Sequence, residues 1–348
     1  MTSATTIIVG AGPIGIELAV AFKQLGVDYL HLEAKQIAHT ISWYPRQVQY
    51  FSSSDRIAIA GVPLHTVDQS KATGEEYLAY LRGVVEQFDL SIRTFEPVTS
   101  IKKDDGQFIV HTSRGDEKGT YQARHVVLAI GDMHRPRLLQ IPGEQLPHVS
   151  HYFDEPHQYF RQRLLIVGGR NSAVETAIRC QRAGSKVTIS YRKASFDSQS
   201  VKYWLTPEIE MLIKTGKVAF HPQTLPRRIT ASHVTLQHAE SGETIEVPCD
   251  FVLLLTGYEM DTSLFEMANV KIEGENRAPT FDPSTMQTNV PGLYVAGTAS
   301  AGTQIRFRLF IENCHPHVAR ITTAITGRQP PFPTQDRTHS GRYRLPES

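Results

Sequence analysis

The stretch "IIVGAGPIGIELA" (residues 7–19) places a glycine turn between a short β-branched run and a helical pattern. Gly10 permits a tight turn, Gly12 lets backbone amides approach a pyrophosphate, and Gly15 allows the helix to pack closely on the strand. The helical pattern begins at Pro13, and the free N–H groups of a helix start attract phosphate. The stretch therefore predicts a dinucleotide-binding turn.

A second strand, "YLHLE" (29–33), follows the helix and completes a βαβ unit within about 30 residues. Glu33 ends this strand, where an acidic side chain can accept hydrogen bonds from ribose hydroxyls. The alternative is a glycine-rich turn in an ordinary α/β core, with Glu33 on the surface. Because both strands, the helix and the acid occur in the expected order, we favour the dinucleotide site.

The same order recurs in the second half of the chain, with "RLLIV" (163–167), a helix from Ala173 to about Ala183, and "KVTISY" (186–191). Here Gly168 permits the tight turn. Ala173 stands at the third glycine position and is small enough for the helix to pack closely on the strand. Arg170 stands at the second glycine position, where it can point away from a pyrophosphate or lie over it as a counter-ion. The residues predicted to line this second turn are Gly168, Arg170, Asn171, Ser172 and Ala173.

Arg192 and Lys193 follow the second strand of this unit, at the place where the first unit has Glu33. Cations there suit a 2′-phosphate, whereas an acid would repel it. The second unit therefore predicts an NADPH site. The alternative is that both cations form a solvated strand end.

The predicted fold class is α/β, with two Rossmann-like domains, the second inserted into the first. Gly and Pro residues near 140 indicate that the chain leaves the first domain there, and "DFVLLLTGYEMD" (250–261) is typical of a return. We predict a discontinuous first domain of residues 1–140 and 262–330 and an inserted domain of residues 141–261. The Pro-rich residues 331–348 predict an extended or mobile arm.

Composition excludes several classes of function. The 348 residues carry a net charge of +1, which gives no electrostatic case for nucleic acid or an anionic membrane. The three cysteines form no CxxC pair, so a reduced cytoplasmic protein is expected. We see no signal peptide and no apolar run of membrane-spanning length. "CHPH" (314–317) has metal-ligating residue types, but the proline hinders their convergence, so no metal is expected.

Three further motifs carry a family resemblance. "AIG" (129–131), "TGY" (256–258) and "TNVPGLYVAGTASAG" (288–302) stand in the order found in two-dinucleotide-binding flavoproteins of the thioredoxin-reductase type, and the chain resembles them over about residues 4–327. The resemblance implies FAD on the first unit and NAD(P)H on the second. It adds to the predicted cofactor-binding residues Gly131, Gly257, Gly297 and Thr298.

Other stretches narrow the resemblance to one branch. "SWYPRQVQYFSSSDRI" (42–57), "PGEQLPHVSHYF" (142–153), "YRKASFDSQSVKYWLTPEIE" (191–210) and "FIEN" (310–313) are similar to the bacillithiol disulfide reductase family, which lacks the CxxC of thioredoxin reductase. The alternative for any single aromatic residue is ordinary core packing. The residues that this resemblance implies near the flavin are Tyr44, Pro45, Ser52 and Ser53.

Two positions depart from the family pattern. Ile14 stands where that family has a reactive cysteine, and isoleucine cannot form a mixed disulfide. Thr298 stands where the wider superfamily has an aspartate on the ribityl chain of the flavin. Threonine can still form a hydrogen bond, so we expect FAD binding to survive better than disulfide chemistry.

The expected function is an NADPH-dependent FAD oxidoreductase. Hydride passes from NADPH to FAD, and electrons pass on to a small acceptor such as a low-molecular-weight disulfide. A flavin monooxygenase is one alternative, because "IPGEQLPHVSHY" partly resembles the fingerprint of N-oxygenating enzymes. A nucleotide-binding redox sensor is another. A homo-oligomer is also expected.

Cys314 is the candidate for any thiol chemistry. It follows "FIEN", which the resemblance places close to the flavin, and His315 or His317 could stabilise its thiolate. The alternative, which we favour, is a helix residue without a redox role. Cys180 and Cys249 are expected to be buried packing residues.

Overall fold

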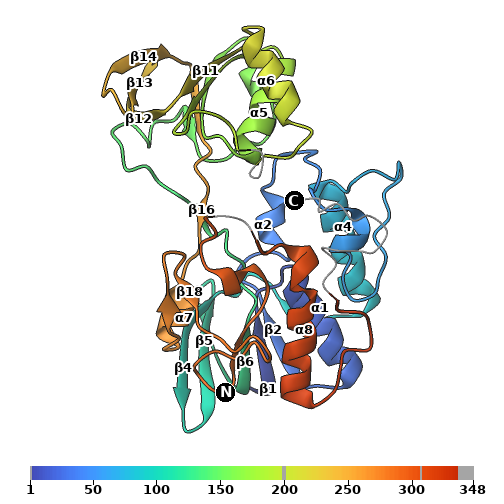
Figure 1. Cartoon of the computed structure of the whole chain (residues 1–348). Helices are drawn as coiled ribbons and strands as arrows, with labels where there is room; N and C mark the ends of the chain where they lie inside the picture. The colour runs from blue at the N-terminus through green and yellow to red at the C-terminus, as the bar shows by residue number, and fades with distance from the viewer. Residues whose placement is uncertain (1, 198–200, 306–307, 336–348) are drawn as a thin grey trace. The chain divides into compact units, whose positions relative to one another are not determined.

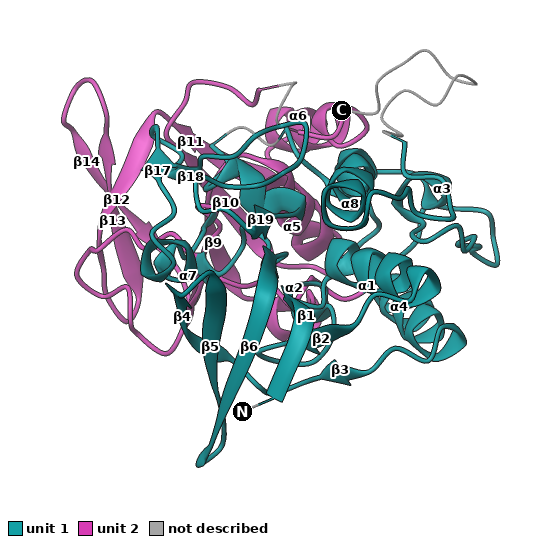
Figure 2. Cartoon of the chain, turned by 90° about the horizontal axis from the view of Figure 1, so that it is seen from below, with its two compact units in different colours: residues 1–42, 47–135, 258–347 teal, residues 43–46, 136–257, 348 magenta. Residues whose placement is uncertain are grey.

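A computed structural model describes residues 2–197, 201–305 and 308–335. Contacts divide these residues into two compact units, coloured separately in Figure 2. Unit 1 holds the residues up to Ser42, those from Gln47 to Arg135, and those from Tyr258 onward. Unit 2 holds Trp43–Arg46 and Pro136–Gly257. The chain therefore leaves unit 1 to build unit 2 and then returns to it.

Unit 1 is built on a mixed sheet, of which Figure 1 labels β1, β2, β4, β5 and β6, and Figure 2 labels β3 and β19 as well. The strand order is β3-β2-β1-β6-β5-β4, and β19 also pairs with β6. Strands β1, β2, β3, β6 and β19 pair in parallel, whereas β4, β5 and β6 pair antiparallel. The parallel strands β1, β6 and β19 end in runs of buried residues, as expected where helices cover the sheet. The strands are β1 (Thr2–Val9), β2 (Tyr29–Leu32), β3 (Ile92–Arg93), β4 (Val98–Asp104), β5 (Gln107–Arg114), β6 (Glu117–Leu128) and β19 (Leu293–Val295).

Local signals fix the main helices of unit 1. Helix α1 starts after Gly12 with proline in its first turn and ends at Gly26, which adopts the left-handed conformation. Thr73 and Glu76 form a reciprocal capping box at the start of α4. The helices and short elements are α1 (Pro13–Leu25), α2 (His39–Ser42), α3 (Ser54–Ile57), α4 (Gly74–Gln87), α7 (Ser263–Met267), β17 (Ile272–Glu273), β18 (Ala278–Pro279), the 3-10 turn Gly297–Ala301 and α8 (Ile311–Thr326).

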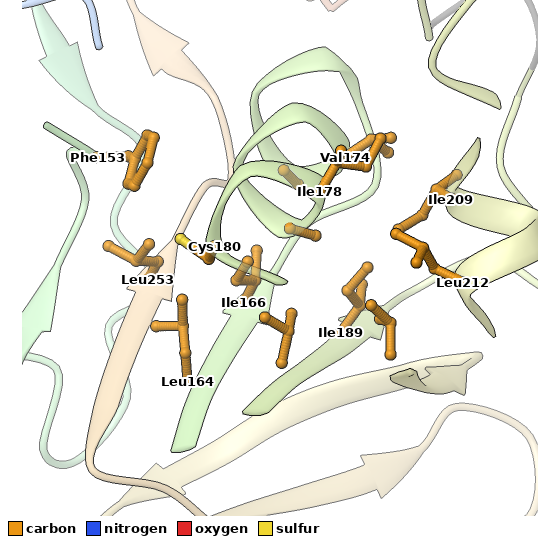
Figure 3. Close-up of a cluster of buried hydrophobic side chains, with 14 of the residues drawn as sticks. Phe153, Leu164, Ile166, Val174, Ile178, Cys180, Ile189, Ile209, Leu212 and Leu253 are labelled. Carbon is orange, nitrogen blue, oxygen red and sulfur yellow. The ribbon is translucent and has the colours of Figure 1, made fainter. Parts of the chain in front are cut away.

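Unit 2 is built on a parallel sheet with the order β11-β10-β9-β15-β8. Its strands alternate between two cores: Leu164 and Ile166 face the α5–α6 side, whereas Leu165 and Val167 face β12–β14. Figure 3 shows the first core, with Cys180 among the apolar side chains. The elements are β8 (Val149–Ser150), the 3-10 turn His157–Tyr159, β9 (Arg163–Val167), α5 (Asn171–Arg182), β10 (Lys186–Tyr191), α6 (Thr206–Lys214), β11 (Val218–Pro222), β12 (Thr224–Ile229), β13 (His233–His238), β14 (Thr244–Pro248) and β15 (Phe251–Leu254).

The chain passes between the units through β7 (Arg135–Pro136) and β16 (Tyr258–Glu259), which pair as a two-stranded ribbon. The segment Trp43–Arg46 also belongs to unit 2, which the sequence did not indicate. The Arg46 guanidinium pairs with the Asp154 carboxylate at 3.0 Å, and the Trp43 ring packs edge-on against Tyr152. The arm predicted at 331–348 lies mostly outside the described residues.

Candidate functional site

The first glycine turn has the geometry that a phosphate-binding turn requires. Gly10 has φ +101°, and a Cβ on it would lie 2.5 Å from the Ala129 carbonyl oxygen. A Cβ on Gly15 would lie 2.0 Å from the Gly10 carbonyl oxygen. Both contacts are with backbone, which cannot move aside, so both positions require glycine for the turn to fold.

Gly12 differs from its neighbours. It has φ −75°, which any residue can adopt, and no atom lies within 4 Å of the place that its Cβ would take. It is the N-cap of α1 and makes no side-chain cap, and Pro13 follows it in the first turn. The fold therefore does not need glycine at this position, whereas a pyrophosphate lying over the helix start would need it.

Glu33 faces this turn from the end of β2. Its Oε2 accepts a hydrogen bond from the Ala11 N–H at 2.7 Å, and its Oε1 accepts one from the Lys35 N–H at 2.8 Å. His31 lies beneath the turn, with its Nε2 3.0 Å from the Gly10 carbonyl oxygen. Burial lowers the pKa of His31 to about 4, so this histidine is a neutral donor that supports the turn.

Three parallel strands bring the other predicted flavin residues to the same edge. In the register of the sheet, Leu128 of β6 lies opposite both Val9 of β1 and Val295 of β19. The segments that follow these strands therefore begin side by side, as the carboxyl ends of parallel strands do in nucleotide-binding folds. They carry Gly10–Gly15, Gly131, and Gly297 with Thr298.

Contacts confirm that these segments meet. Gly131 and Gly297 both have positive φ, +74° and +69°. A Cβ on Gly131 would lie 4.0 Å from the Thr298 hydroxyl, and one on Gly297 would lie 3.6 Å from Ile14. The buried Ile14 side chain thus sits against the glycine that precedes Thr298. The residues here fit an FAD cradle, with an alkyl group at the position of the family's thiol.

The residues of stretch 42–57 are divided between the units. Ser52 is buried, and Ser53 is the N-cap of α3 in unit 1. Tyr44 and Pro45 belong instead to the segment grouped with unit 2, and the Tyr44 ring packs edge-on against Trp43. The structure thus brings Ser52 and Ser53 into the unit with the first glycine turn, but not Tyr44 and Pro45.

A buried polar network joins α1, α3 and α8. His315 Nδ1 lies 2.8 Å from Glu17 Oε2, and His315 Nε2 lies 3.0 Å from the Arg56 carbonyl oxygen. The Ala60 N–H donates to Glu17 Oε1 at 3.1 Å. Because a carbonyl oxygen only accepts, Nε2 must carry a proton, and a further proton is shared along Nδ1···Oε2. Glu17 and His315 are both fully buried, and no motif in the sequence indicates this pair.

His317, two residues further along α8, has a different role. Its Nδ1 accepts a hydrogen bond from the Gly297 N–H at 3.1 Å, so this nitrogen carries no proton. Burial lowers the pKa of His317 to about 4, and the nearby positive charge of Arg320 lowers it further. His317 is therefore a neutral side chain that holds Gly297, rather than a partner for a thiolate.

The second glycine turn is tight for a different reason. Gly168 has φ +148°, and a Cβ on it would lie 2.5 Å from the Leu255 carbonyl oxygen and 3.0 Å from the Ala173 Cβ. A Cβ on Gly169 would lie 2.5 Å from the Tyr191 ring. The Tyr191 ring therefore packs directly on the backbone of Gly169, which leaves no room for a side chain there. Gly169 was not among the predicted site residues.

Arg170 is the N-cap of α5 and adopts an extended conformation with φ −112°. Burial lowers its pKa, the like charges of Arg192 and Arg137 lower it further, and Tyr191 and Asp197 act in the opposite sense. Three guanidinium groups therefore lie within electrostatic range of one another near the start of α5. Arg137 was not predicted for this site, because it lies in the loop after β7, far along the chain from the glycine motif.

The other residues predicted for this unit have varied surroundings. Lys193 pairs loosely with Asp197 at 3.6 Å, and Arg192 is exposed. Asn171 accepts a hydrogen bond from the Lys202 N–H through its side-chain oxygen at 2.6 Å, whereas Ser172 is exposed. Gly257 has φ +98° and accepts a hydrogen bond from a residue beside the crossing, the Arg137 N–H, at 2.9 Å.

All three cysteines are buried. Burial raises the pKa of Cys180 to about 12 and that of Cys249 to about 11, so neither forms a thiolate readily. The predicted burial of these two residues is confirmed. Cys314 is also fully buried, in the first turns of α8.

Within the described residues, no helix combines the length and the apolar character needed to cross a membrane. The same residues contain no group of three or more His, Cys, Asp or Glu side chains placed to hold a metal ion.

The model of the protein family described as "Pyridine nucleotide-disulphide oxidoreductase" matches residues 7–297. The chain belongs to this family. It is similar to Bacilliredoxin reductase Bdr of Bacillus subtilis, with 34% identity over 94% of this chain and 99% of the relative. A solved structure of Bacillithiol Disulfide Reductase Bdr (YpdA) from Bacillus cereus matches with a TM-score of 0.89 and 33% identity, over 94% of this chain and 100% of that one. A ferredoxin–NADP reductase of Ignicoccus hospitalis is 26% identical over 91% of this chain and 95% of the relative.

These findings confirm the predicted resemblance and the fold class of two Rossmann-like domains. The protein is an FAD-dependent NAD(P)H oxidoreductase, and FAD and NADPH are its cofactors. A monooxygenase is less well supported than a reductase.

Proposed function

We propose that this oxidoreductase transfers electrons from NADPH through FAD to a low-molecular-weight acceptor, without a protein thiol. The observation that carries the proposal is Ile14, a buried alkyl side chain packed against Gly297 in the FAD cradle. The three buried cysteines leave no accessible thiol in its place. A disulfide is one acceptor class, as the names of the bacillithiol disulfide reductase relatives suggest.

The proposed FAD site is the edge formed by β1, β6 and β19. The start of α1 would hold the pyrophosphate, Glu33 would orient the ribose, and Thr298 would bond to the ribityl chain. When bound, the cofactor pair supplies hydride and electron transfer, while the chain supplies binding and orientation. The proposed FAD-binding residues are Gly10, Gly12, Pro13, Gly15, Glu33, Ser52, Ser53, Gly131, Gly297 and Thr298, with Tyr44 and Pro45 proposed on the family resemblance alone.

The proposed NADPH site is the start of α5 together with the end of β10. The backbone of the turn would hold the pyrophosphate, and Arg170 and Arg137 would neutralise it. Arg192 and Lys193 would bind the 2′-phosphate. The further proposed residues are Gly168, Asn171 and Ser172 through backbone N–H groups, Ala173 through close packing, and Gly257.

The experiment that tests the function is stopped-flow reduction of the bound flavin by NADPH, followed by a screen of acceptors under nitrogen and in air. Turnover with low-molecular-weight disulfides or quinones under nitrogen would support the proposal. Oxygen consumption tied to a substrate would indicate a monooxygenase. Slow NADPH oxidation with every acceptor, together with a protein partner, would indicate a redox sensor. Light scattering on the same sample tests the predicted homo-oligomer.

Replacing Arg192 with alanine is expected to weaken NADPH selectively. Loss of a charge-assisted phosphate contact costs about 1.5–3 kcal/mol, so the KM for NADPH should rise roughly 10- to 150-fold. The KM for NADH, which lacks the 2′-phosphate, should hardly change. Arg228→Ala, which removes another exposed cation of unit 2 on β12, serves as the control. Equal effects of Arg192→Ala on both nucleotides would show that Arg192 does not read the 2′-phosphate.

Replacing Cys314 with serine is expected to leave the rates with every acceptor unchanged. The Cys314 side chain is fully buried, so a disulfide substrate cannot reach it in this conformation. The measurement is NADPH oxidation with disulfide, quinone and oxygen acceptors, and Cys180→Ser is a matched buried control in unit 2. Loss of disulfide turnover alone would identify a single-thiol reductase instead.

A further inference from the structure

Two large aromatic side chains stand exposed on the loop between β10 and α6. Tyr203 is 74% exposed and Trp204 is 37% exposed. Their rings meet edge to face, with centroids 4.9 Å apart and an interplanar angle of 89°. Tyr and Trp that remain in water while held in a fixed arrangement are typical of binding surfaces.

The pair is anchored on both sides. Val201 and Leu205, which flank it, are buried in the core between the parallel sheet and the helices α5 and α6. Because both neighbours are fixed in the core, the loop cannot turn Tyr203 and Trp204 inward without losing that packing. The exposure of the pair therefore follows from the way the loop is attached.

Lys202 ties this loop to the start of α5. It is only 8% exposed; its N–H donates to Asn171 Oδ1 at 2.6 Å, and its Nζ donates to Glu175 Oε2 at 2.9 Å. Its ammonium also lies 5.6 Å from the centre of the Trp204 ring. Asn171 and Glu175 lie in the first turns of α5, whose N-terminus is the proposed pyrophosphate site. The aromatic pair is therefore presented beside that site.

The order of the strands in unit 2 indicates which half of the dinucleotide would contact Tyr203 and Trp204. The sheet order is β11-β10-β9-β15, and the loop starts from Arg192 and Lys193 at the end of β10. In a Rossmann unit, the end of this second strand binds the adenosine ribose, while the nicotinamide extends across the start of the first helix to the other side. A loop that joins β10 to α6 thus borders the adenosine half.

We infer that Tyr203 and Trp204 together hold the adenine ring of NADPH, stacked on the face of one ring and against the edge of the other, beside the cations that bind its 2′-phosphate. Aromatic side chains stack on a base whatever its hydrogen-bonding pattern, so the pair contributes affinity, while Arg192 and Lys193 distinguish NADPH from NADH. This inference rests on the proposed NADPH site. It adds residues that the glycine motif does not reveal.

The test is calorimetric binding of adenosine 2′,5′-bisphosphate and of NADP⁺ to the FAD-loaded enzyme. The bisphosphate contains the adenine and the 2′-phosphate but no nicotinamide. Trp204→Ala and Tyr203→Ala should each weaken both ligands by the same factor, roughly 5- to 150-fold, which is the range for loss of one stacked base. Trp204→Phe should restore most of the affinity.

Phe160→Ala is the matched control. Phe160 is 50% exposed in the same unit but precedes the amino end of β9, whereas the aromatic pair follows the carboxyl end of β10, so Phe160→Ala should leave both affinities unchanged. Weaker NADP⁺ with unchanged bisphosphate would place the pair on the nicotinamide and overturn the inference. Unchanged affinity for both ligands would also overturn it, and a simultaneous change in molecular mass would assign the pair to contact between copies. If the unmodified enzyme bound no bisphosphate, the proposed NADPH site itself would fail.

Discussion

Gly12→Val is expected to give folded protein that purifies without FAD. No atom lies within 4 Å of the place that the new Cβ would take, and the backbone of Gly12 is in a conformation that valine tolerates. The fold should therefore survive the change. The added side chain would occupy the space over the start of α1, where the pyrophosphate is proposed to lie. The flavin absorbance per protein, measured after purification, should fall close to zero.

Two comparisons make this result specific to the cofactor. Gly83→Val also adds a side chain to unit 1, in α4, where no atom lies within 4 Å, and should keep its full flavin content. Gly15→Val should instead fail to fold, because its Cβ would lie 2.0 Å from the Gly10 carbonyl oxygen. Gly12→Val protein that retained full FAD occupancy would show that the pyrophosphate does not lie over this turn.

Glu17→Leu is expected to lower the free energy of unfolding by about 3–5 kcal/mol. Removing one member of a buried ion pair leaves the other member, here His315, buried without its counter-charge. His315 Nδ1 and the Ala60 N–H would both lose their acceptor in a site without water access. The measurement is the midpoint of urea unfolding of the FAD-free protein, monitored by far-ultraviolet circular dichroism, because both tryptophans, Trp43 and Trp204, lie in unit 2. Glu86→Leu, at an exposed position of α4, should shift the stability by less than about 0.5 kcal/mol.

The double variant Glu17→Leu/His315→Leu separates the pair from general disruption. Replacing both partners by apolar side chains leaves no stranded charge, so part of the lost stability should return. The two single losses would add up in the double variant if the residues acted independently. An unfolding midpoint of Glu17→Leu equal to that of the unmodified protein would show that the pair contributes nothing.

Features with local causes could be predicted from the sequence. Helix α1 (Pro13–Leu25) begins at the predicted residue, because Gly12 and Pro13 mark its start within the chain itself, as Gly26 marks its end. The predicted turn at Gly168 is present for the same reason.

Features with distant partners could not be predicted. The Arg46–Asp154 pair joins residues more than a hundred positions apart, and nothing in either stretch indicates the other. The need for Gly169 depends on the position of the Tyr191 ring, which only the packed unit reveals. The burial of Cys314 depends on which face α8 turns inward, and a single Cys-His-Pro-His stretch does not determine it.

The segment Trp43–Arg46 has a consequence for modular exchange. Recombination that moved Pro136–Gly257 into another flavoprotein would leave Asp154 and Tyr152 without the partners that this short segment supplies from far upstream. The Arg179 guanidinium, which donates to the Arg46 carbonyl at 2.6 Å, would lose its acceptor as well. A transplant of the nucleotide domain would therefore have to carry two pieces of sequence, Trp43–Arg46 and Pro136–Gly257.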